Sequence, residues 1–221
     1  MFEQITSNIF QVGGDSLSHH TDAAVYLVKG ADSSLLIDAG TGRGTDILLK
    51  NIRSAGVSPE TIKYLFLTHC HYDHSGGAAD IRSACGCGIV CHSHDAAYLE
   101  RGDPEVTAAS WYRAEILPLS IDIQPEETHT SFSADELEID YIHTPGHSPG
   151  SSVLLMSSDG LTVLFGQDIH GPLNEVLLSD RELYLKSLEY LITLNADILC
   201  EGHFGIIKGR DRVRDFIESY L

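Results

Sequence analysis

The chain has 221 residues, a formal net charge of −18, and only 14 Lys and Arg against 32 Asp and Glu. This length accommodates a sizeable core in one α/β domain. Proteins that bind nucleic acid or anionic membranes usually carry a basic patch, so the scarce and scattered basic residues argue against both kinds of partner.

The apolar pattern predicts strands on both sides of a helical middle section. Short apolar runs rich in β-branched residues are typical of strands, and they occur at residues 5–12, 23–28, 34–37, 64–67, 89–91, 137–142, 153–156, 161–165 and 198–200. The second and third runs flank a turn at Gly30, so we expect a hairpin. The run 64–67 is apolar throughout, which is typical of a strand buried on both faces.

Helical periodicity falls between these runs and at the C-terminus. Apolar residues at helical spacing predict helices over 46–55, from about Gly76, within 94–116, after Ser179 and around 213–217. Ser179 and Glu182 have the spacing of a capping box. The order of elements favours mixed sheets packed face to face with helices outside. We therefore expect one domain over residues 1–221, with a helical insertion at about 94–118 that would suit a homodimer.

The strongest chemical signal directly follows the apolar run 64–67. His69, His71, Asp73 and His74 fall within six residues there, and imidazole and carboxylate ligands suit zinc or iron. At a strand end, His69 and His71 would point the same way because the side-chain period of a strand is two. We expect these two residues to share one ion, while Asp73 and His74 on the following turn reach a second.

Three further candidate ligands stand where predicted strands meet loops. His147 lies in a turn rich in Pro and Gly, Asp168 ends the run that begins at Leu161, and His203 closely follows the last predicted strand. Isolated histidines are usually surface or core residues, and we expect that of His19, His20, His92, His94, His129 and His143.

With these motifs in this order, the chain resembles the metallo-β-lactamase superfamily over nearly its whole length. The matching segments are Leu36-Ile37-Asp38-Ala39-Gly40, the histidine motif, Thr144-Pro145-Gly146-His147, Gly166-Gln167-Asp168 and Gly202-His203. The resemblance implies an αββα sandwich with the site at one edge. It implies a first ion on His69, His71 and His147, a second on Asp73, His74 and His203, and Asp168 between them. Asp38 would support the ligands from beneath.

Departures from the family's branches narrow the expected activity. The β-lactamases generally lack an aspartate at the position of Asp168, and flavodiiron proteins replace the second motif histidine, here His71, with glutamate. Glyoxalase-type thioesterases share all seven ligand positions. However, they usually add a C-terminal helical region, and their usual sequence after the aspartate differs from Ile169-His170-Gly171-Pro172. Persulfide dioxygenases hold one iron at the positions of His69, His147 and Asp168, but their Arg-Thr-Asp stretch is missing here.

The function expected from the sequence is hydrolysis with two divalent metal ions. A metal-bridging hydroxide would attack the carbonyl of a small ester, thioester or lactone. Asp73 would orient the nucleophile or shuttle its proton, and His170 would bond to substrate. Zinc is the first expectation, and iron or manganese also suits the ligands. The alternative is a mononuclear non-haem iron oxidoreductase resembling persulfide dioxygenases. A non-catalytic metal-binding relative is a weaker third hypothesis.

Other features bear on substrate contact and on the cellular compartment. His19 and His20 follow a Gly-Gly turn that could cover the pocket, whereas Trp111 and Tyr112 are expected in the core rather than in a pocket wall. The five cysteines have irregular spacing that favours buried thiols over disulfides, and the tract 85–94 is expected to be structural. With no leader pattern and no long apolar run, a cytoplasmic location is expected.

Overall fold

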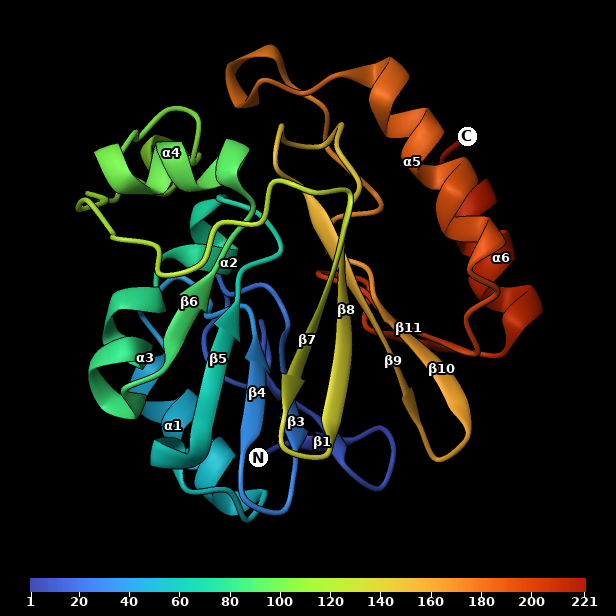
Figure 1. The fold of residues 1–221 in the computed structure, drawn as a ribbon. Coiled ribbons are helices and arrows are strands. Elements are labelled where there is room, and N and C mark those ends of the chain that lie inside the picture. Colours follow the sequence, from blue (N-terminus) through green and yellow to red (C-terminus); the bar gives the residue numbers. More distant parts are fainter.

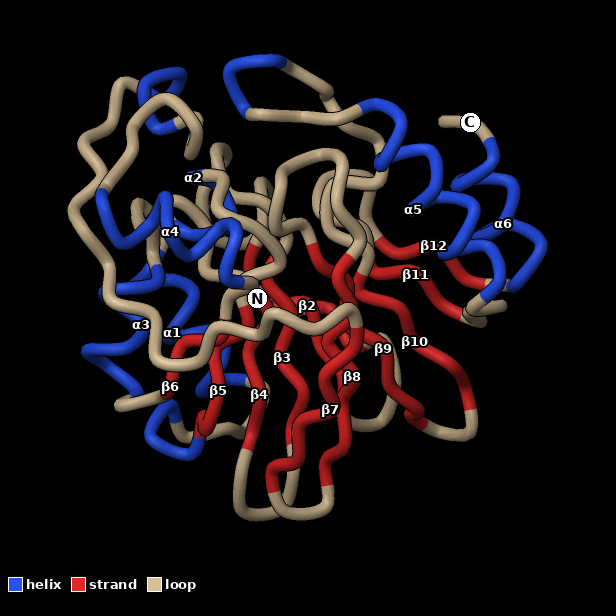
Figure 2. Tube along the Cα trace, turned by 45° about the horizontal axis from the view of Figure 1, so that its top comes forward, coloured by secondary structure: helices blue, strands red, loops and turns tan.

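Two mixed β-sheets of six strands each form the centre of the protein, and helices cover both outer faces (Figure 1). The computed structural model describes residues 1–221. The layers therefore run helix, sheet, sheet, helix, which confirms the expected αββα sandwich. Figure 2 shows the strands side by side at the centre and the helices at the periphery.

The first sheet is built from the N-terminal part of the chain in sequence order. Its strands are β1 (Glu3–Gln4), β2 (Ile9–Gly13), β3 (Val25–Lys29), β4 (Ser34–Ile37), β5 (Ile62–Phe66) and β6 (Gly88–Val90). β3 and β4 pair antiparallel, as the predicted hairpin requires, and β5 pairs parallel to both β4 and β6. The predicted strand over 5–12 is too long. Residues 5–8 turn instead, with the Ile5 and Thr6 amides donating to the Ile9 carbonyl.

The second sheet is built from the C-terminal part of the chain. Its strands are β7 (His129–Ala134), β8 (Leu137–His143), β9 (Ser152–Ser158), β10 (Leu161–Phe165), β11 (Ile198–Cys200) and β12 (Ile206–Lys208). Neighbouring strands are antiparallel except β10 and β11. The sequence analysis missed β7 and β12. Both are edge strands with little buried surface, so their residues lack a strong apolar pattern.

The outer helices contact the sheets through apolar stripes. They are α1 (Thr45–Ser54), α2 (Tyr72–Ser75), α3 (Ala78–Cys85), α4 (Ser93–Arg101), α5 (Arg181–Thr193) and α6 (Arg210–Glu218), with short 3-10 turns η1 (Pro59–Thr61), η2 (Ala109–Tyr112) and η3 (Glu175–Leu177). In α1, Leu48 and Ile52 are buried one turn apart. Gly56 follows that helix with a φ of 79°, the left-handed conformation typical of a helix end.

Two of the predicted helix starts differ from the structure. The helix expected from Gly76 is preceded by α2, which begins at Tyr72. The start of α5 is capped by Asp180, whose carboxylate accepts the amides of Glu182 and Leu183. The predicted capping box at Ser179 is therefore wrong. The Ser179 hydroxyl instead donates to the carbonyl oxygen of His147 at 2.7 Å, because Asp180 already satisfies the helix amides.

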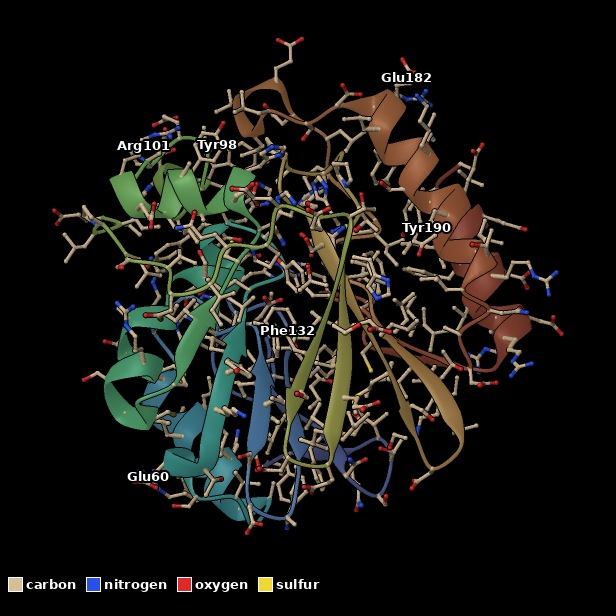
Figure 3. All side chains as sticks on the ribbon, viewed as in Figure 1. Glu60, Tyr98, Arg101, Phe132, Glu182 and Tyr190 are labelled. Carbon is tan, nitrogen blue, oxygen red and sulfur yellow. The ribbon has the colours of Figure 1, made fainter.

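The interior between the sheets is apolar and aromatic. Phe66, Tyr141 and Phe165 are buried there, and the half-buried Phe132 contacts Phe66 edge to face at 5.1 Å between ring centroids. Figure 3 shows Phe132 between the two sheets. Burying one such side chain stabilises the fold by about 1.5–3 kcal/mol. This core fixes the spacing of the sheets, and with it the distances between loops that leave their common edge.

Residues 94–118 contain α4, η2 and irregular chain. α4 ends where Gly102 adopts a φ of 63°. The Arg101 guanidinium lies 4.0 Å from the centre of the Tyr98 ring on this helix (Figure 3). None of the helices is both long enough and apolar enough to cross a lipid bilayer.

Candidate metal centre

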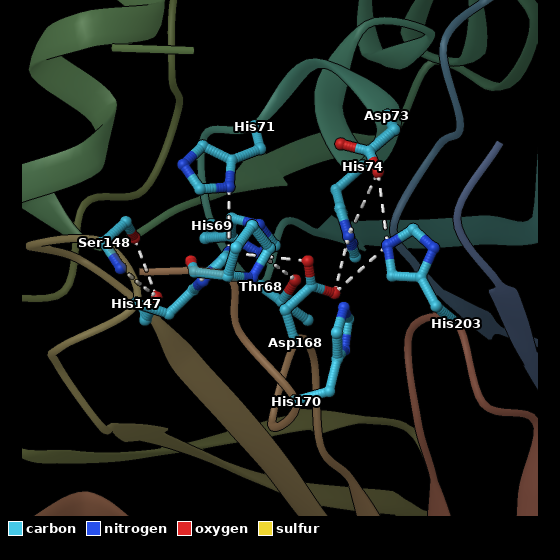
Figure 4. A network of polar contacts seen from close by, with 12 residues as sticks. Thr68, His69, His71, Asp73, His74, His147, Ser148, Asp168, His170 and His203 are labelled. Carbon is cyan, nitrogen blue, oxygen red and sulfur yellow. Dashed lines mark hydrogen bonds and ion pairs between the residues drawn. The ribbon is translucent and has the colours of Figure 1, made fainter. Parts of the chain in front are cut away.

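The candidate ligands lie at one edge of the sandwich. β8, β10 and β11 run in the same direction, so the loops that follow them begin at the same edge. The segment after β5 reaches this edge from the other sheet. These segments together bring seven side chains to one place (Figure 4), and the seven are His69, His71, Asp73, His74, His147, Asp168 and His203.

Two groups of ligand atoms can be distinguished within this cluster. The first contains His69, His71, His147 and Asp168, and their ligand atoms all lie within 4.8 Å of one another. All four residues are buried. The rings of His69 and His71 meet edge to face with centroids 4.5 Å apart. The sequence analysis grouped the three histidines in the same way.

The second group contains Asp73, His74 and His203, whose ligand atoms also lie within 4.8 Å of one another. Asp73 and His74 are buried, whereas the His203 side chain is 33% exposed. His203 Nε2 lies 3.2 Å from Asp73 Oδ2. This group therefore forms the solvent-facing half of the centre.

Asp168 contacts both groups. Its Oδ2 lies 3.4 Å from His147 Nε2, and its Oδ1 lies 3.0 Å from His74 Nε2 and 3.3 Å from His203 Nε2. Figure 4 shows this carboxylate between the two sets of rings. A carboxylate with one oxygen toward each group has the arrangement needed to bridge two cations.

The polar atoms at the centre lack sufficient protein partners. His69 Nε2, His74 Nε2 and Asp168 Oδ1 are buried there and have no hydrogen-bond partner, and His71 faces His147 Nε2 with its Nδ1 at 2.9 Å. An unsatisfied buried polar atom costs about 1–3 kcal/mol, so three at one point call for a ligand. Imidazole nitrogens and carboxylate oxygens are suitable ligands for divalent transition metals. The residues present therefore fit the divalent metal ions that the sequence predicts.

The two groups differ in protonation. Burial lowers the pKa of His69 well below its ordinary value and lowers the pKa of His71 to about 3, so both rings are neutral. Burial would also lower the pKa of His203, but its close contacts with the carboxylates of Asp168 and Asp73 outweigh burial and raise that pKa to about 10. Burial alone would raise the pKa of Asp168, yet His74 and His203 hold it well below its usual range. The neutral rings of His69 and His71 and the anionic carboxylate of Asp168 are in the forms that bind cations.

Asp38 supports the centre from beneath, as the family resemblance implied. Its Oδ2 lies 2.7 Å from His74 Nδ1, and its Oδ1 accepts the Thr68 amide at 2.9 Å. The Thr68 hydroxyl also donates to Asp38 and lies 3.0 Å from His69 Nδ1. These contacts occupy the Nδ1 atoms of His69 and His74 and leave both Nε2 atoms directed at the centre.

The reason given from sequence for the orientation of the motif histidines is wrong. β5 ends at Phe66, so His69 and His71 lie on a bend rather than on a strand, and Asp73 and His74 lie in α2 rather than on a turn. Strand alternation therefore does not align the two rings. The bend does so, and Asp95 holds it by accepting the Cys70 amide at 2.8 Å.

Asp95 is a supporting residue that the sequence analysis missed. It is buried, and besides the Cys70 amide it accepts the Ser148 hydroxyl at 2.7 Å and the Gly150 amide at 2.6 Å. One carboxylate thus ties the segment of His69 and His71 to the loop of His147. No sequence pattern links Asp95 to either segment, because the three contacts join parts of the chain 25 to 55 residues apart.

Glu201 is a second supporting residue that was missed. It is buried, and its Oε2 accepts the amides of His203 and Phe204 at 2.6 and 2.8 Å. Its Oε1 lies 3.0 Å from Nδ1 of His170. Glu201 therefore positions His203 through the backbone and His170 through its ring. The sequence signal that could have identified Glu201 is its position as a charged residue directly after the apolar run 198–200.

A cavity of about 240 Å³ opens onto the cluster. Five of the seven candidate ligands line it, and the other lining residues are Ala108, Trp111, Tyr112, His170, Pro172 and Leu177. Trp111 is 49% exposed, so its expected place in the core is wrong; η2 presents it to the cavity. His19 and His20 do not line this cavity.

Residues 21–203 match the family described as the metallo-beta-lactamase superfamily. The chain belongs to this superfamily. A probable metallo-hydrolase of Methanocaldococcus jannaschii is 31% identical over 62% of this chain and 64% of its own length. An acyl-coenzyme A thioesterase of Gallus gallus is 27% identical over 97% of this chain and 84% of its own. The family and the enzyme class predicted from sequence, a metal-dependent hydrolase of this superfamily, are confirmed.

The fold also matches solved members of the superfamily. A metallo-β-lactamase of Cronobacter sakazakii superposes with a TM-score of 0.78, at 22% identity, over 91% of this chain and 77% of its own. At this identity the similarity establishes the shared sandwich fold, and the substrate has to be inferred from the site itself.

Proposed function

We propose that this protein hydrolyses a small carboxylic thioester or ester with two divalent metal ions, most suitably zinc. His69, His71 and His147 would hold one ion, Asp73, His74 and His203 the other, and Asp168 both. The observation that carries this proposal is the position of Asp168, whose two oxygens face the two groups. When bound, the ions would supply Lewis acidity that lowers the pKa of a coordinated water and polarises a carbonyl.

Two residues of the chain would assist the reaction. Asp73 lies in α2 at the cavity, where its carboxylate can orient the attacking water and take up its proton. His170 donates from Nδ1 to Glu201, so its Nε2 is free for the substrate. A histidine oriented by a buried carboxylate is suited to bond the substrate or to protonate a leaving group.

The walls of the cavity favour a substrate with an apolar acyl group. Trp111, Leu177 and Pro172 line the cavity together with the candidate ligands. An apolar wall facing a polar reaction centre fits an acyl chain whose carbonyl reaches the metals. The similarity to an acyl-coenzyme A thioesterase supports thioesters as the first substrates to assay. Lactones share the same carbonyl chemistry and belong in the same panel.

The mononuclear iron oxidoreductase is not proposed. Such a site would need only His69, His147 and Asp168, and it would give Asp73, His74 and His203 no part in binding the metal. These three residues form a complete second group around the same carboxylate. Two ions account for all seven side chains.

The decisive variant is Asp168→Ala, compared with Asp32→Ala in an exposed turn. Bound metal should fall in the Asp168 variant, and hydrolysis of thioesters and esters should fall about a thousandfold, which corresponds to about 4 kcal/mol of activation free energy. The Asp32 variant should match the wild type. Metal is counted by elemental analysis and turnover by product release. Full metal and full activity in Asp168→Ala would contradict the proposal.

A further inference from the structure

Three histidines outside the catalytic cluster also converge in space. His92 follows β6, His94 lies in the first turn of α4, and His143 is the last residue of β8. One ligand nitrogen from each lies within 4.8 Å of the other two. The rings of His92 and His143 stack with centroids 3.7 Å apart, and His94 meets His92 edge to face at 5.0 Å. The sequence places two of these histidines together, and the fold adds the third.

The backbone of this cluster is held by well-defined contacts. The His92 amide donates to the Tyr141 hydroxyl at 2.9 Å, and Tyr141 is fully buried. The His143 amide donates to the Thr128 carbonyl at 2.9 Å. The backbone positions of two of the three histidines are therefore held in place, so only their side-chain torsions need to change to bind one ion.

The imidazole nitrogens of the cluster are left available. His92 is only 1% exposed, and its buried Nε2 has no hydrogen-bond partner. His143 donates from Nε2 to the Pro149 carbonyl at 2.9 Å, which leaves its Nδ1 lone pair free. A ring nitrogen bonded to a carbonyl is the usual orienting contact of a metal-binding histidine.

The charge state of the cluster suits a cation. Burial, followed by the neighbouring His143 and His94, lowers the pKa of His92 to about 3. Burial also lowers the pKa of His143. Both rings are thus neutral near pH 7, the state that coordinates metals. The net charge of −18 raises the local concentration of cations around the molecule.

We propose that His92, His94 and His143 form a second metal site, which takes one divalent zinc-like cation apart from the catalytic centre. Three imidazoles and a water complete a tetrahedral zinc shell. The stacked rings must turn about their Cβ–Cγ bonds to aim at one ion, and this torsion is broad for histidine. This rotation would break the hydrogen bond from the His94 amide to His92 Nδ1. The loss is small because the two atoms are already 3.4 Å apart.

The ion would join two elements that carry parts of the catalytic edge. It would link the start of α4, where Asp95 lies, to the end of β8, from which the loop of His147 leaves. The bond from His143 to Pro149 extends this link into the loop itself. The site would therefore connect α4 and β8 outside the cavity that the seven-residue cluster lines.

The test counts zinc in the whole protein after equilibrium dialysis against micromolar zinc. The variants are His94→Ala, His92→Gln and, as a control, His129→Ala, an exposed histidine on the neighbouring strand β7. Wild type and the control should bind one zinc per chain more than His94→Ala and His92→Gln. His94 is exposed, so its removal leaves the fold intact. An anomalous-scattering map at the zinc edge should place that ion at the three histidines.

Equal zinc content in wild type and His94→Ala would overturn the proposal. An equal loss in His94→Ala and His129→Ala would also overturn it, because it would indicate unspecific binding to surface histidines. The readout is a difference between variants that share the catalytic residues. It therefore stands whether the catalytic centre holds two ions, one or none, and its failure is distinct from failure of the proposed hydrolase.

Discussion

The protein has two histidine clusters at the same edge of its fold, and they are constructed differently. The seven-residue cluster contains Asp73 and Asp168 among its candidate ligands, and Asp38 orients one of its rings. The cluster of His92, His94 and His143 contains no carboxylate, and one ring is oriented by a backbone carbonyl. Carboxylates add charge and can bridge cations, so the comparison separates a centre suited to two ions and catalysis from one suited to a single ion.

Removing one histidine from each cluster should give the sharpest contrast. In His147→Ala we expect turnover to fall about a thousandfold, because the variant loses a proposed metal ligand whose Nε2 lies 3.4 Å from Asp168. In His94→Ala turnover should stay within about twofold, since that exposed ring lies outside the cavity lining. The measurement is kcat and KM on the best thioester found. Equal losses in the two variants would mean that the clusters act as one site.

Asp38→Asn should weaken metal binding without removing a proposed ligand. The amide keeps an acceptor for the Thr68 amide but loses the charge beside His74 Nδ1. Loss of such a supporting carboxylate typically lowers metal affinity about 10–100-fold. Competition against a chelator measures the effect, and Asp32→Asn is the matched control. Unchanged affinity in Asp38→Asn would show that His74 does not depend on Asp38.

Glu201 and His170 should act as a pair. We expect Glu201→Gln and His170→Ala each to lower kcat about tenfold, because the buried carboxylate orients the ring that faces the cavity. If they share one role, the double variant should be hardly worse than either single variant. Metal content is measured in parallel, since Glu201 also bonds the His203 amide. Fully additive losses would separate the two roles.

The smallest expected effect is the response of stability to acid at His92. Burial lowers its pKa to about 3, below the ordinary value of 6.5, so the unfolded chain takes up this proton first. The stability of the folded protein therefore falls as the pH drops from about 6.5 towards 3. Replacing His92 by Gln should make the fall in Tm between pH 7.5 and pH 5.5 smaller than in wild type. In His129→Gln the fall in Tm should be the same as in wild type. An equal reduction in both variants would contradict the assignment of this effect to His92.

Much of the fold was predictable from the sequence because buried strands consist of short runs of apolar residues. The runs at β3, β4, β10 and β11 are apolar because both faces of these strands are covered. β7 and β12 have no such apolar run, since edge strands bury little surface. The cap at Asp180 was assigned one residue early because Ser179 also fits a capping pattern, and the hydrogen bonds from the Glu182 and Leu183 amides to Asp180 decide between the two.

The candidate ligands were predictable for a different reason. Ligand chemistry restricts residue type, so His69, His71, Asp73 and His74 stand out within one short segment, and His147, Asp168 and His203 stand out at strand ends. The supporting residues Asp95 and Glu201 are ordinary acidic residues in the sequence. Their roles depend on which backbone amides lie beside them, and those amides belong to loops distant in the chain.

The sequence by itself determined the sandwich, the family and the set of candidate metal ligands. These depend on side-chain chemistry and on local apolar patterns, both of which a linear chain displays. Only the tertiary structure decided how Asp168 lies between two groups, which carboxylates hold the loops, that Trp111 faces the cavity, and that His143 joins His92 and His94. Those relations join residues far apart in sequence, and only the packing of the two sheets brings them within contact distance.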